Sequence, residues 1–151
     1  MAARCVLTPH VGEFLRLRAA DGHDPDKHGD LVFDDDCRVA AAREAALECG
    51  QVVVLNGART VIADPDGRAA VSPFENPALA SAGTGDVLAG TIWALLAQCL
   101  GTFDAAQLGV YLHGMAGEAV RARIGDAGLL ASDLPIELPL ARKRLADGTR
   151  G

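Results

Sequence analysis

The sequence lacks the features that mark metal-binding, redox or membrane proteins. Its four cysteines are widely separated, with no C-x-x-C pair and no clustered histidines, so zinc and redox motifs have no support. The apolar run at the N-terminus is too brief for a signal peptide, and no stretch approaches the length of a membrane span. We therefore expect a cytoplasmic protein with no membrane association.

Positive charge and aromatic residues are also scarce. The chain has 14 Lys and Arg against 20 Asp and Glu, a net charge of −6, and its basic residues form no stripe. A nucleic-acid partner is therefore not expected. A phosphorylated ligand would have to be bound by locally directed backbone amides rather than by bulk positive charge. Aromatic residues supply only 4% of the chain, which predicts a core of aliphatic side chains.

Apolar residues make up half of the 151 residues, enough for the core of one α/β domain that spans residues 1–151. Residues 51–55 form a continuous apolar, mostly β-branched run, typical of a strand buried on both faces of a parallel sheet. The turn sequence D-P-D-G at 64–67 predicts an edge hairpin between 60–63 and 68–71. We also expect a strand over 4–8 and helices over about 10–20, from the acidic run 34–36 to residue 49, and over 85–100, 104–124 and 133–147.

The segment from Ser81 to Asp86 (S-A-G-T-G-D) directly precedes an apolar helical run. Gly83 and Gly85 let the backbone approach a ligand closely, and the free amides at a helix N-terminus favour an anion. The hydroxyl of Thr84 would add a donor. Asp86 would face a bound phosphate, as a general base or as an indirect magnesium ligand. The pattern predicts a phosphate-binding turn, although Asp86 could alternatively do no more than complement the helix dipole.

Five sequence blocks resemble, in the same order, the NAD(P)H-hydrate dehydratase family. They are L-T-P-H-x-G-E at 7–13, V-V-L-N-G-A-R-T at 53–60, N-P-A-L-A-S-A-G-T-G-D-V-L-A-G at 76–90, G-V-Y-L-H-G-M-A-G at 109–117 and A-S-D-L-P-x-x-L-P at 131–139. The resemblance implies a ribokinase-like, three-layer α/β/α fold with a mainly parallel sheet. It also implies an enzyme that uses ADP or ATP, with magnesium, to convert hydrated NADH or NADPH back to the normal cofactor.

The resemblance also assigns roles to individual residues. Asp86 is the acid-base residue and contacts the hydrated nicotinamide, as does His10. Magnesium would bridge nucleotide oxygens rather than occupy a site built from protein ligands. Glu13 and Asn76 are secondary candidates, and Glu13 could instead complete a capping interaction with residue 10. The residues expected to bind the nucleotide are Asn56, Gly57, Ala58, Arg59, Thr60, Gly83, Thr84 and Gly85.

The sequence departs from the family in two respects. Asn56 stands where members usually have lysine, and an amide cannot replace the charge of that lysine, so nucleotide affinity or catalysis would be weakened. The strands and helices that begin the family domain have no counterpart before residue 7. A sheet without its neighbouring strands exposes edge hydrogen bonds and apolar faces. We therefore expect a homo-oligomer, or pairing with a chain that supplies the missing N-terminal half.

Two other functions stay open at this point. The same phosphate-binding turn would serve a small-alcohol or vitamin-precursor kinase of the ribokinase superfamily, although His10 in place of asparagine disfavours it. The chain could also be a truncated, non-catalytic domain that binds nucleotide or a protein partner. Asn56 and the missing N-terminal part favour that third interpretation.

Overall fold

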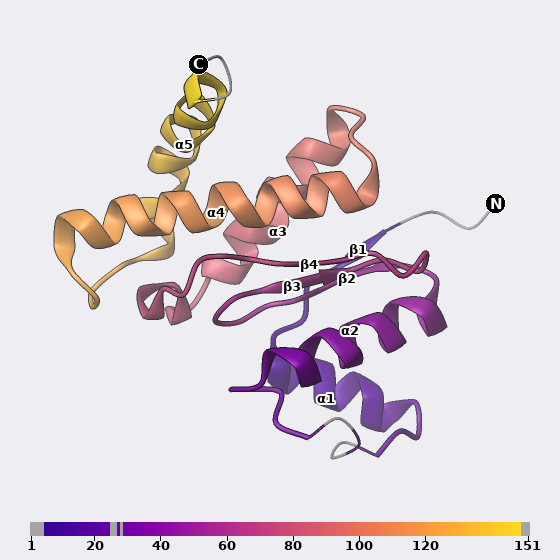
Figure 1. The fold of residues 1–151 in the computed structure, drawn as a ribbon. Helices are drawn as coiled ribbons and strands as arrows, with labels where there is room; N and C mark the ends of the chain where they lie inside the picture. The colour runs from indigo at the N-terminus through magenta and orange to yellow at the C-terminus, as the bar shows by residue number, and fades with distance from the viewer. Residues whose placement is uncertain (1–4, 25–26, 28, 149–151) are drawn as a thin grey trace.

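The fold is built on a four-stranded sheet with helices on both faces (Figure 1). The computed structural model describes residues 5–24, 27 and 29–148. In these residues the strands, in their order across the sheet, are β1 (Val6–Leu7), β2 (Val52–Leu55), β3 (Val61–Ala63) and β4 (Ala69–Val71). The α-helices are α1 (Val11–Ala20), α2 (Asp35–Cys49), α3 (Thr84–Ala97), α4 (Thr102–Ile124) and α5 (Leu134–Gly148).

The sheet is mixed and is less parallel than the resemblance implies. β1 and β2 are parallel, whereas β2 pairs with β3 and β3 with β4 in antiparallel register. The β3–β4 hairpin was expected from the D-P-D-G turn, in which the Asp64 carboxylate accepts the backbone N–H of Arg68 at 2.9 Å. β2 and β3 are antiparallel because the loop 56–60 between them is too short for a parallel crossover, which needs a dozen or more residues.

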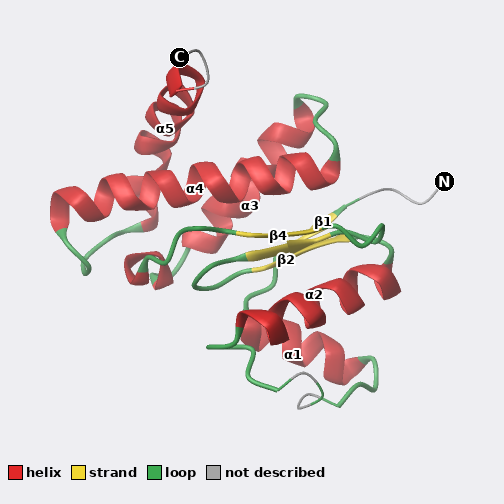
Figure 2. Ribbon diagram, viewed as in Figure 1, coloured by secondary structure: helices red, strands yellow, loops and turns green. Residues whose placement is uncertain are grey.

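Helices cover the sheet in two layers, with α1 and α2 on one face and α3 and α4 on the other (Figures 1 and 2). β2 is buried along its whole length, as its continuous apolar run predicted. Alternate β2 side chains enter two separate cores: Val53 and Leu55 pack with the alanines of α2, and Val52 and Val54 with Leu88 and other side chains of α3 and α4. This three-layer arrangement confirms the α/β/α expectation.

The C-terminal helix α5 packs on α4 and forms the outermost part of the molecule (Figure 1). Two short 3-10 helices, η1 (Pro77–Ala80) and η2 (Ala131–Asp133), were not expected from the sequence. η1 begins at Asn76, whose side-chain oxygen accepts the backbone N–H of Ala78 at 3.0 Å. Among the described residues, no helix combines the length and the apolarity that a membrane span needs.

Candidate functional site

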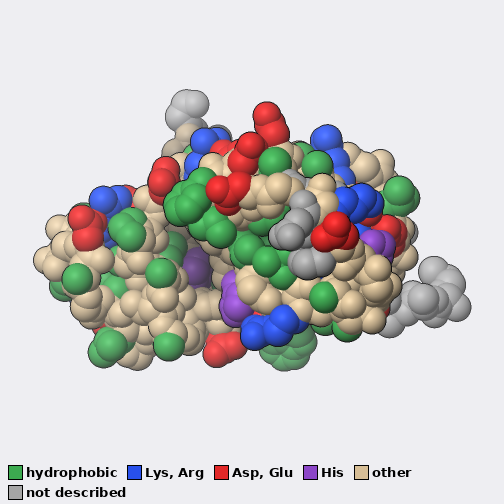
Figure 3. Space-filling view, turned by 90° about the horizontal axis from the view of Figure 1, so that it is seen from below, with side chains coloured by type: hydrophobic (Ala, Val, Ile, Leu, Met, Phe, Trp, Pro, Cys, Tyr) green, Lys and Arg blue, Asp and Glu red, His purple; other side chains and the backbone are tan. Residues whose placement is uncertain are grey.

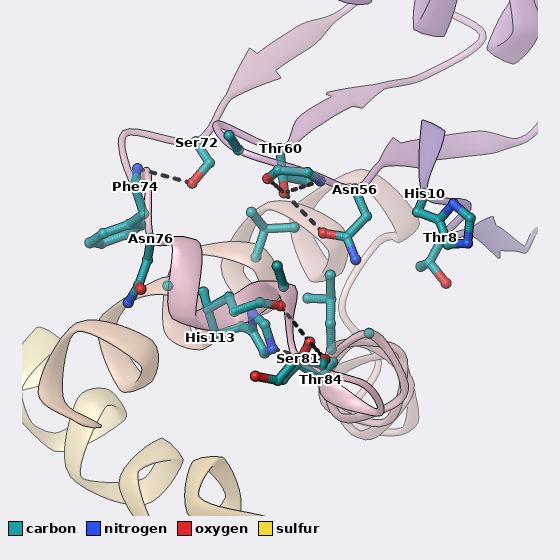
Figure 4. A pocket seen from close by; sticks show the side chains of 18 of the residues that line it. Thr8, His10, Asn56, Thr60, Ser72, Phe74, Asn76, Ser81, Thr84 and His113 are labelled. Carbon is teal, nitrogen blue, oxygen red and sulfur yellow. Dashed lines mark hydrogen bonds between the residues drawn. The ribbon is translucent and has the colours of Figure 1, made fainter. Parts of the chain in front are cut away.

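A cavity of about 1010 Å³ opens beyond the carboxyl ends of β1 and β2. The space-filling view shows the face of the molecule that is hollowed, with histidine side chains in the hollow (Figure 3). In the close view, side chains from four segments of the chain surround this space (Figure 4). The predicted site residues that line the cavity are His10, Glu13, Asn56, Gly57, Ala58, Thr60, Asn76, Gly83, Thr84, Gly85 and Asp86.

The turn before α3 has the conformation that its glycines predict. Gly83 is the N-cap residue and adopts the left-handed region, with φ 85°. The backbone angle favours glycine, and a Cβ atom at this position would also press on the Cβ atom of Ala131, at 3.1 Å. No described side chain caps α3. The N–H of Thr84 donates to the carbonyl oxygen of Ser81 at 3.3 Å, whereas the amides of Gly85 and Asp86 have no partner among the described residues and are free for an anion in the cavity.

Thr84 differs from the sequence-based expectation. Its side chain is buried, and Oγ1 lies 2.6 Å from the carbonyl oxygen of Leu79 and 2.8 Å from that of Ser81. A hydroxyl has one proton to donate, and here that proton is directed to the backbone. The expectation that Thr84 offers a hydroxyl donor to a ligand is therefore wrong, because α3 begins at Thr84 and turns this side chain inward. Thr84 instead holds the turn in shape.

Asp86 lies in the first turn of α3 with its side chain exposed at the cavity. Its carboxylate accepts no hydrogen bond from the part of the chain that the structure describes. A carboxylate at a helix N-terminus is stabilised by the helix dipole, but that role does not require it to face a cavity. A free carboxylate beside free backbone amides is the arrangement that proton transfer near a bound phosphate needs.

His10 and Glu13 form a reciprocal capping box at the start of α1. The backbone N–H of Glu13 donates to Nδ1 of His10 at 3.2 Å, and the backbone N–H of His10 donates to Oε2 of Glu13 at 3.0 Å. Nε2 of His10 lies 3.6 Å from Oε1 of Glu13. The capping alternative for Glu13 is thus confirmed. More than half of the His10 side chain stays exposed, so capping orients the imidazole beside the cavity without closing it off.

The loop 56–60 connects β2 to β3 and forms part of the cavity wall. Its backbone pairs with the segment that follows β1, since the N–H of Asn56 donates to the carbonyl oxygen of Pro9 at 2.8 Å. The hydroxyl of Thr60 closes the loop, at 3.0 Å from the carbonyl oxygen of Gly57 and 3.3 Å from Oδ1 of Asn56. A Cβ atom at Gly85 would lie 3.4 Å from Nδ2 of Asn56. The loop and the turn before α3 are therefore in direct proximity, as both motifs require for a shared ligand.

Arg59 is the one predicted site residue outside the cavity lining. It has φ 50°, its N–H donates to the carbonyl oxygen of Phe74 at 3.1 Å, and its guanidinium pairs with Asp35 at 2.9 Å. The expectation that Arg59 binds the nucleotide is not supported by this geometry, because the left-handed backbone carries the side chain toward α2.

Arg38 was not foreseen as part of the site. It is only 2% exposed, and its guanidinium donates to the carbonyl oxygens of Ala58 and, at 3.1 Å, of Leu55. Burial lowers the pKa of Arg38, an effect that Asp35 opposes and Arg59 reinforces. A signal was present in the sequence: Arg38 precedes Ala41, Ala42 and Ala45 at helical spacing, so it belongs to the buried stripe of α2.

Helix α4 supports the turn before α3 and the residues around η1. Nε2 of the buried His113 lies 3.0 Å from the carbonyl oxygen of Thr84. Since a carbonyl can only accept, Nε2 carries the proton in this contact. Burial lowers the pKa of His113, which favours the neutral ring. Gly114 and Gly117 allow Phe74 and Leu79 to approach, because a Cβ atom would lie 2.2 Å from Phe74 and 2.8 Å from Leu79.

Negative charge dominates the cavity wall. Glu13, Glu75 and Asp86 line it, and Arg121 is the only lysine or arginine among the described lining residues. The guanidinium of Arg121 is paired with Asp126 and lies 3.8 Å from Glu118. An anionic ligand must therefore be held mainly by backbone amides, as the composition indicated. Asn76 is buried in this wall, and its Nδ2 has no partner among the described residues.

A family model described as NAD(P)H-hydrate dehydratase matches residues 1–139. The bifunctional NAD(P)H-hydrate repair enzyme Nnr of Thermofilum pendens is 43% identical over 145 residues, 96% of this chain but 26% of the relative. The chain thus spans about a quarter of such bifunctional proteins.

Solved structures give the same result for the fold. The ADP/ATP-dependent NAD(P)H-hydrate dehydratase from Bacillus subtilis, co-crystallised with ATP and Mg²⁺, matches with a TM-score of 0.81 and 38% identity, covering 93% of this chain and 48% of the other. A ribokinase-like superfamily protein from Enterococcus faecalis matches with a TM-score of 0.70 and 28% identity, covering 91% and 44%. The fold is therefore ribokinase-like, and the chain corresponds to about half of these solved chains.

Proposed function

Because the chain belongs to the NAD(P)H-hydrate dehydratase family, we propose that it provides the nucleotide site and the acid-base residue for ADP- or ATP-dependent dehydration of hydrated NADH or NADPH. One observation supports this proposal above the others. The exposed carboxylate of Asp86, the glycine turn before α3 and the imidazole of His10 line one cavity, together with the loop 56–60.

The proposed reaction has two steps. The hydroxyl oxygen on the hydrated nicotinamide ring attacks the terminal phosphorus of the nucleotide, and Asp86 accepts the hydroxyl proton. The bond between that phosphorus and the bridging oxygen breaks, which releases AMP from ADP or ADP from ATP. The ring carbon–oxygen bond then breaks to release phosphate, and loss of a ring proton restores the double bond. Phosphorylation turns a poor leaving group into a good one. Backbone amides at Gly83 and Gly85 would stabilise the charge on the transferred phosphoryl group.

The carboxylate of Asp86 also suits a magnesium ion that arrives with the nucleotide. Mg²⁺ prefers oxygen ligands and keeps several waters, and Asp86 offers free carboxylate oxygens at the cavity. The carboxylate of Glu13 is the second candidate, but it already accepts the N–H of His10. When bound, the ion would neutralise nucleotide oxygens, while Asp86 holds its water shell or accepts the substrate proton.

An assay with hydrated NADH and ADP, or ATP, tests the proposal. We expect recovery of the nicotinamide absorbance together with release of inorganic phosphate. A stable phosphorylated product would instead indicate a kinase of the same superfamily. Calorimetry with ADP should accompany the assay, because nucleotide binding without turnover would identify a non-catalytic binding domain.

We also propose that the open side of the sheet pairs with another copy of the chain or with a chain that supplies further strands. β1 is an edge strand, Leu7 on it is 38% exposed, and Trp93 on α3 is 72% exposed. Unpaired edges and exposed aromatic side chains favour association. Light scattering should show a dimer or larger species, and a strict monomer contradicts self-association.

All four cysteines are free thiols, which supports a reducing, cytoplasmic compartment.

A further inference from the structure

The guanidinium of Arg38 lies against the loop 56–60. Nη1 donates to the carbonyl oxygen of Ala58 and Nη2 to that of Leu55, at 3.1 Å. A Cβ atom on Gly57 would lie 3.0 Å from Nη2, so glycine leaves the room that the guanidinium occupies. Arg38 does not line the cavity. Any effect it has on a ligand must therefore act through the loop.

Each of these two contacts orients a whole peptide unit. In a planar trans peptide the C=O and the next N–H point in opposite directions. The unit between Leu55 and Asn56 is held by Arg38 at its oxygen and by Pro9 at its N–H, at 2.8 Å. The unit between Ala58 and Arg59 is held by Arg38 at its oxygen and by Phe74 at its N–H, at 3.1 Å. Arg38 thus holds the two peptide units whose N–H groups donate to Pro9 and Phe74.

One backbone amide in the middle of the loop, that of Ala58, is left free by this arrangement. The hydroxyl of Thr60 contacts the carbonyl oxygen of Gly57, which directs the N–H of Ala58 away from Thr60. That N–H has no partner among the described residues, and Ala58 lines the cavity. A free amide in a rigidly held loop is a donor for an anionic ligand.

The charge of Arg38 is only partly compensated. Asp35 lies 3.8 Å from Nη1 and pairs more closely with Arg59, at 2.9 Å. Nε of Arg38 is buried and has no partner among the described residues. A positive charge therefore remains behind a cavity whose wall carries three carboxylates.

We propose that Arg38 is a positioning residue of the nucleotide site: its guanidinium fixes the peptide units on both sides of Gly57 and keeps the amide of Ala58 available to the nucleotide. The inference rests on the proposed nucleotide site. Lysine cannot replace Arg38, because one ammonium group does not reproduce a planar fork that reaches two carbonyl oxygens.

Titration calorimetry with ADP on the full chain tests this role, using Arg38→Lys and Arg38→Met. We expect both variants to raise the Kd for ADP about tenfold, the effect of losing one charge-assisted hydrogen bond. The matched control is Arg18→Lys, since Arg18 is also buried on the α1–α2 face and pairs with Glu44 and Glu48, far along the chain from the loop. Arg18→Lys should lower the unfolding temperature and leave the Kd unchanged.

Amide hydrogen exchange provides the second measurement. We expect exchange at Asn56 and Arg59 to accelerate in Arg38→Lys and not in Arg18→Lys. A folded Arg38→Lys protein with a Kd within about twofold of the parent overturns the inference. If the parent chain binds no ADP, the proposed function fails, and unchanged exchange at Asn56 and Arg59 separately overturns the role of Arg38. If neither Arg38 variant folds, the parent chain alone provides the test. The bonded amides of Asn56 and Arg59 should exchange more slowly than the free amide of Ala58, and equal exchange at the three residues overturns the inference.

Discussion

Nε2 of His113, on α4, donates a hydrogen bond to the carbonyl oxygen of Thr84, the first residue of α3, at 3.0 Å. The contact joins the most buried histidine of the site to the turn that carries Gly83 and Asp86. It also fixes which ring nitrogen is protonated, because only a donor can face a carbonyl. Within the G-V-Y-L-H-G block, His113 thus supports the turn before α3.

The buried position of His113 predicts a pH dependence of stability. Burial lowers its pKa in the folded chain below the ordinary value of 6.5. The unfolded chain therefore takes up a proton at a higher pH than the folded chain. The stability is fully present above about pH 6.5 and is lost as the pH falls toward the lowered pKa. Thermal unfolding at pH 7.5 and 5.5 should show a smaller acid-induced decrease for His113→Gln, which keeps a donor for Thr84. Equal decreases would contradict this assignment.

Replacing Asp86 separates chemistry from helix stability. Asp86→Asn should lower dehydratase turnover at least about 100-fold, the usual scale for lost acid-base help, while ADP still binds. Asp104 is the matched control, since it also lies in the first turn of a helix but does not line the cavity. Asp104→Asn should keep full turnover. A near-normal rate for Asp86→Asn in a steady-state assay would refute the role of Asp86.

Restoring a lysine at position 56 tests the effect of the missing charge. Asn56 lines the cavity beside Gly85, and a lysine ammonium there would face nucleotide phosphate. Two unit charges at 4 Å attract by about 1 kcal/mol even in bulk water, so Asn56→Lys should tighten ADP binding at least about fivefold. Calorimetry at low and high salt should show that the gain decreases with salt. Asn56→Met, which adds length without charge, should show no such gain.

A comparison of two glycines with left-handed backbone separates the effect of backbone strain on stability from the effect of the site on ADP binding. Gly83 has φ 85° in the turn before α3, and Gly67 has φ 88° in the β3–β4 turn. Replacing either with alanine should cost about 1–2 kcal/mol of stability, measured by chemical denaturation. Only Gly83→Ala should also weaken ADP binding, since a Cβ atom there would lie 3.1 Å from Ala131, whereas Gly67 has open space. Equal affinity in both variants would remove Gly83 from the site.

Much of the fold follows from local sequence. The buried strand β2, the β3–β4 hairpin and the five α-helices of the described chain lie where the apolar spacing, the D-P-D-G turn and the capping residues predict them. The site was predictable to the extent that its residues belong to contiguous motifs. His10 follows β1, Asn56 follows β2, and Asp86 lies in the first turn of α3. All three line one cavity.

The contacts between distant segments were not predictable. The orientation of Thr84 depends on whether α3 begins at residue 84 or 85, and helix ends are the least certain part of any sequence-based assignment. The spacing of the alanines places Arg38, unlike the exposed Arg43, on the buried face of α2, but it does not show which groups the guanidinium contacts. Its partners, Leu55 at the end of β2 and Ala58 in the loop 56–60, are brought to α2 only by tertiary packing.

The close packing of α4 has a mechanical consequence. One continuous helix of 23 residues holds the turn before α3 through His113, and Phe74 and Leu79 through Gly114 and Gly117. Three residues of the cavity wall, Phe74, Leu79 and Thr84, therefore contact the same helix. On the opposite wall, the loop 56–60 meets this side of the cavity at two points: the N–H of Arg59 donates to the carbonyl oxygen of Phe74, and Asn56 lies beside Gly85. A movement of that wall relative to α4 must therefore change those two contacts.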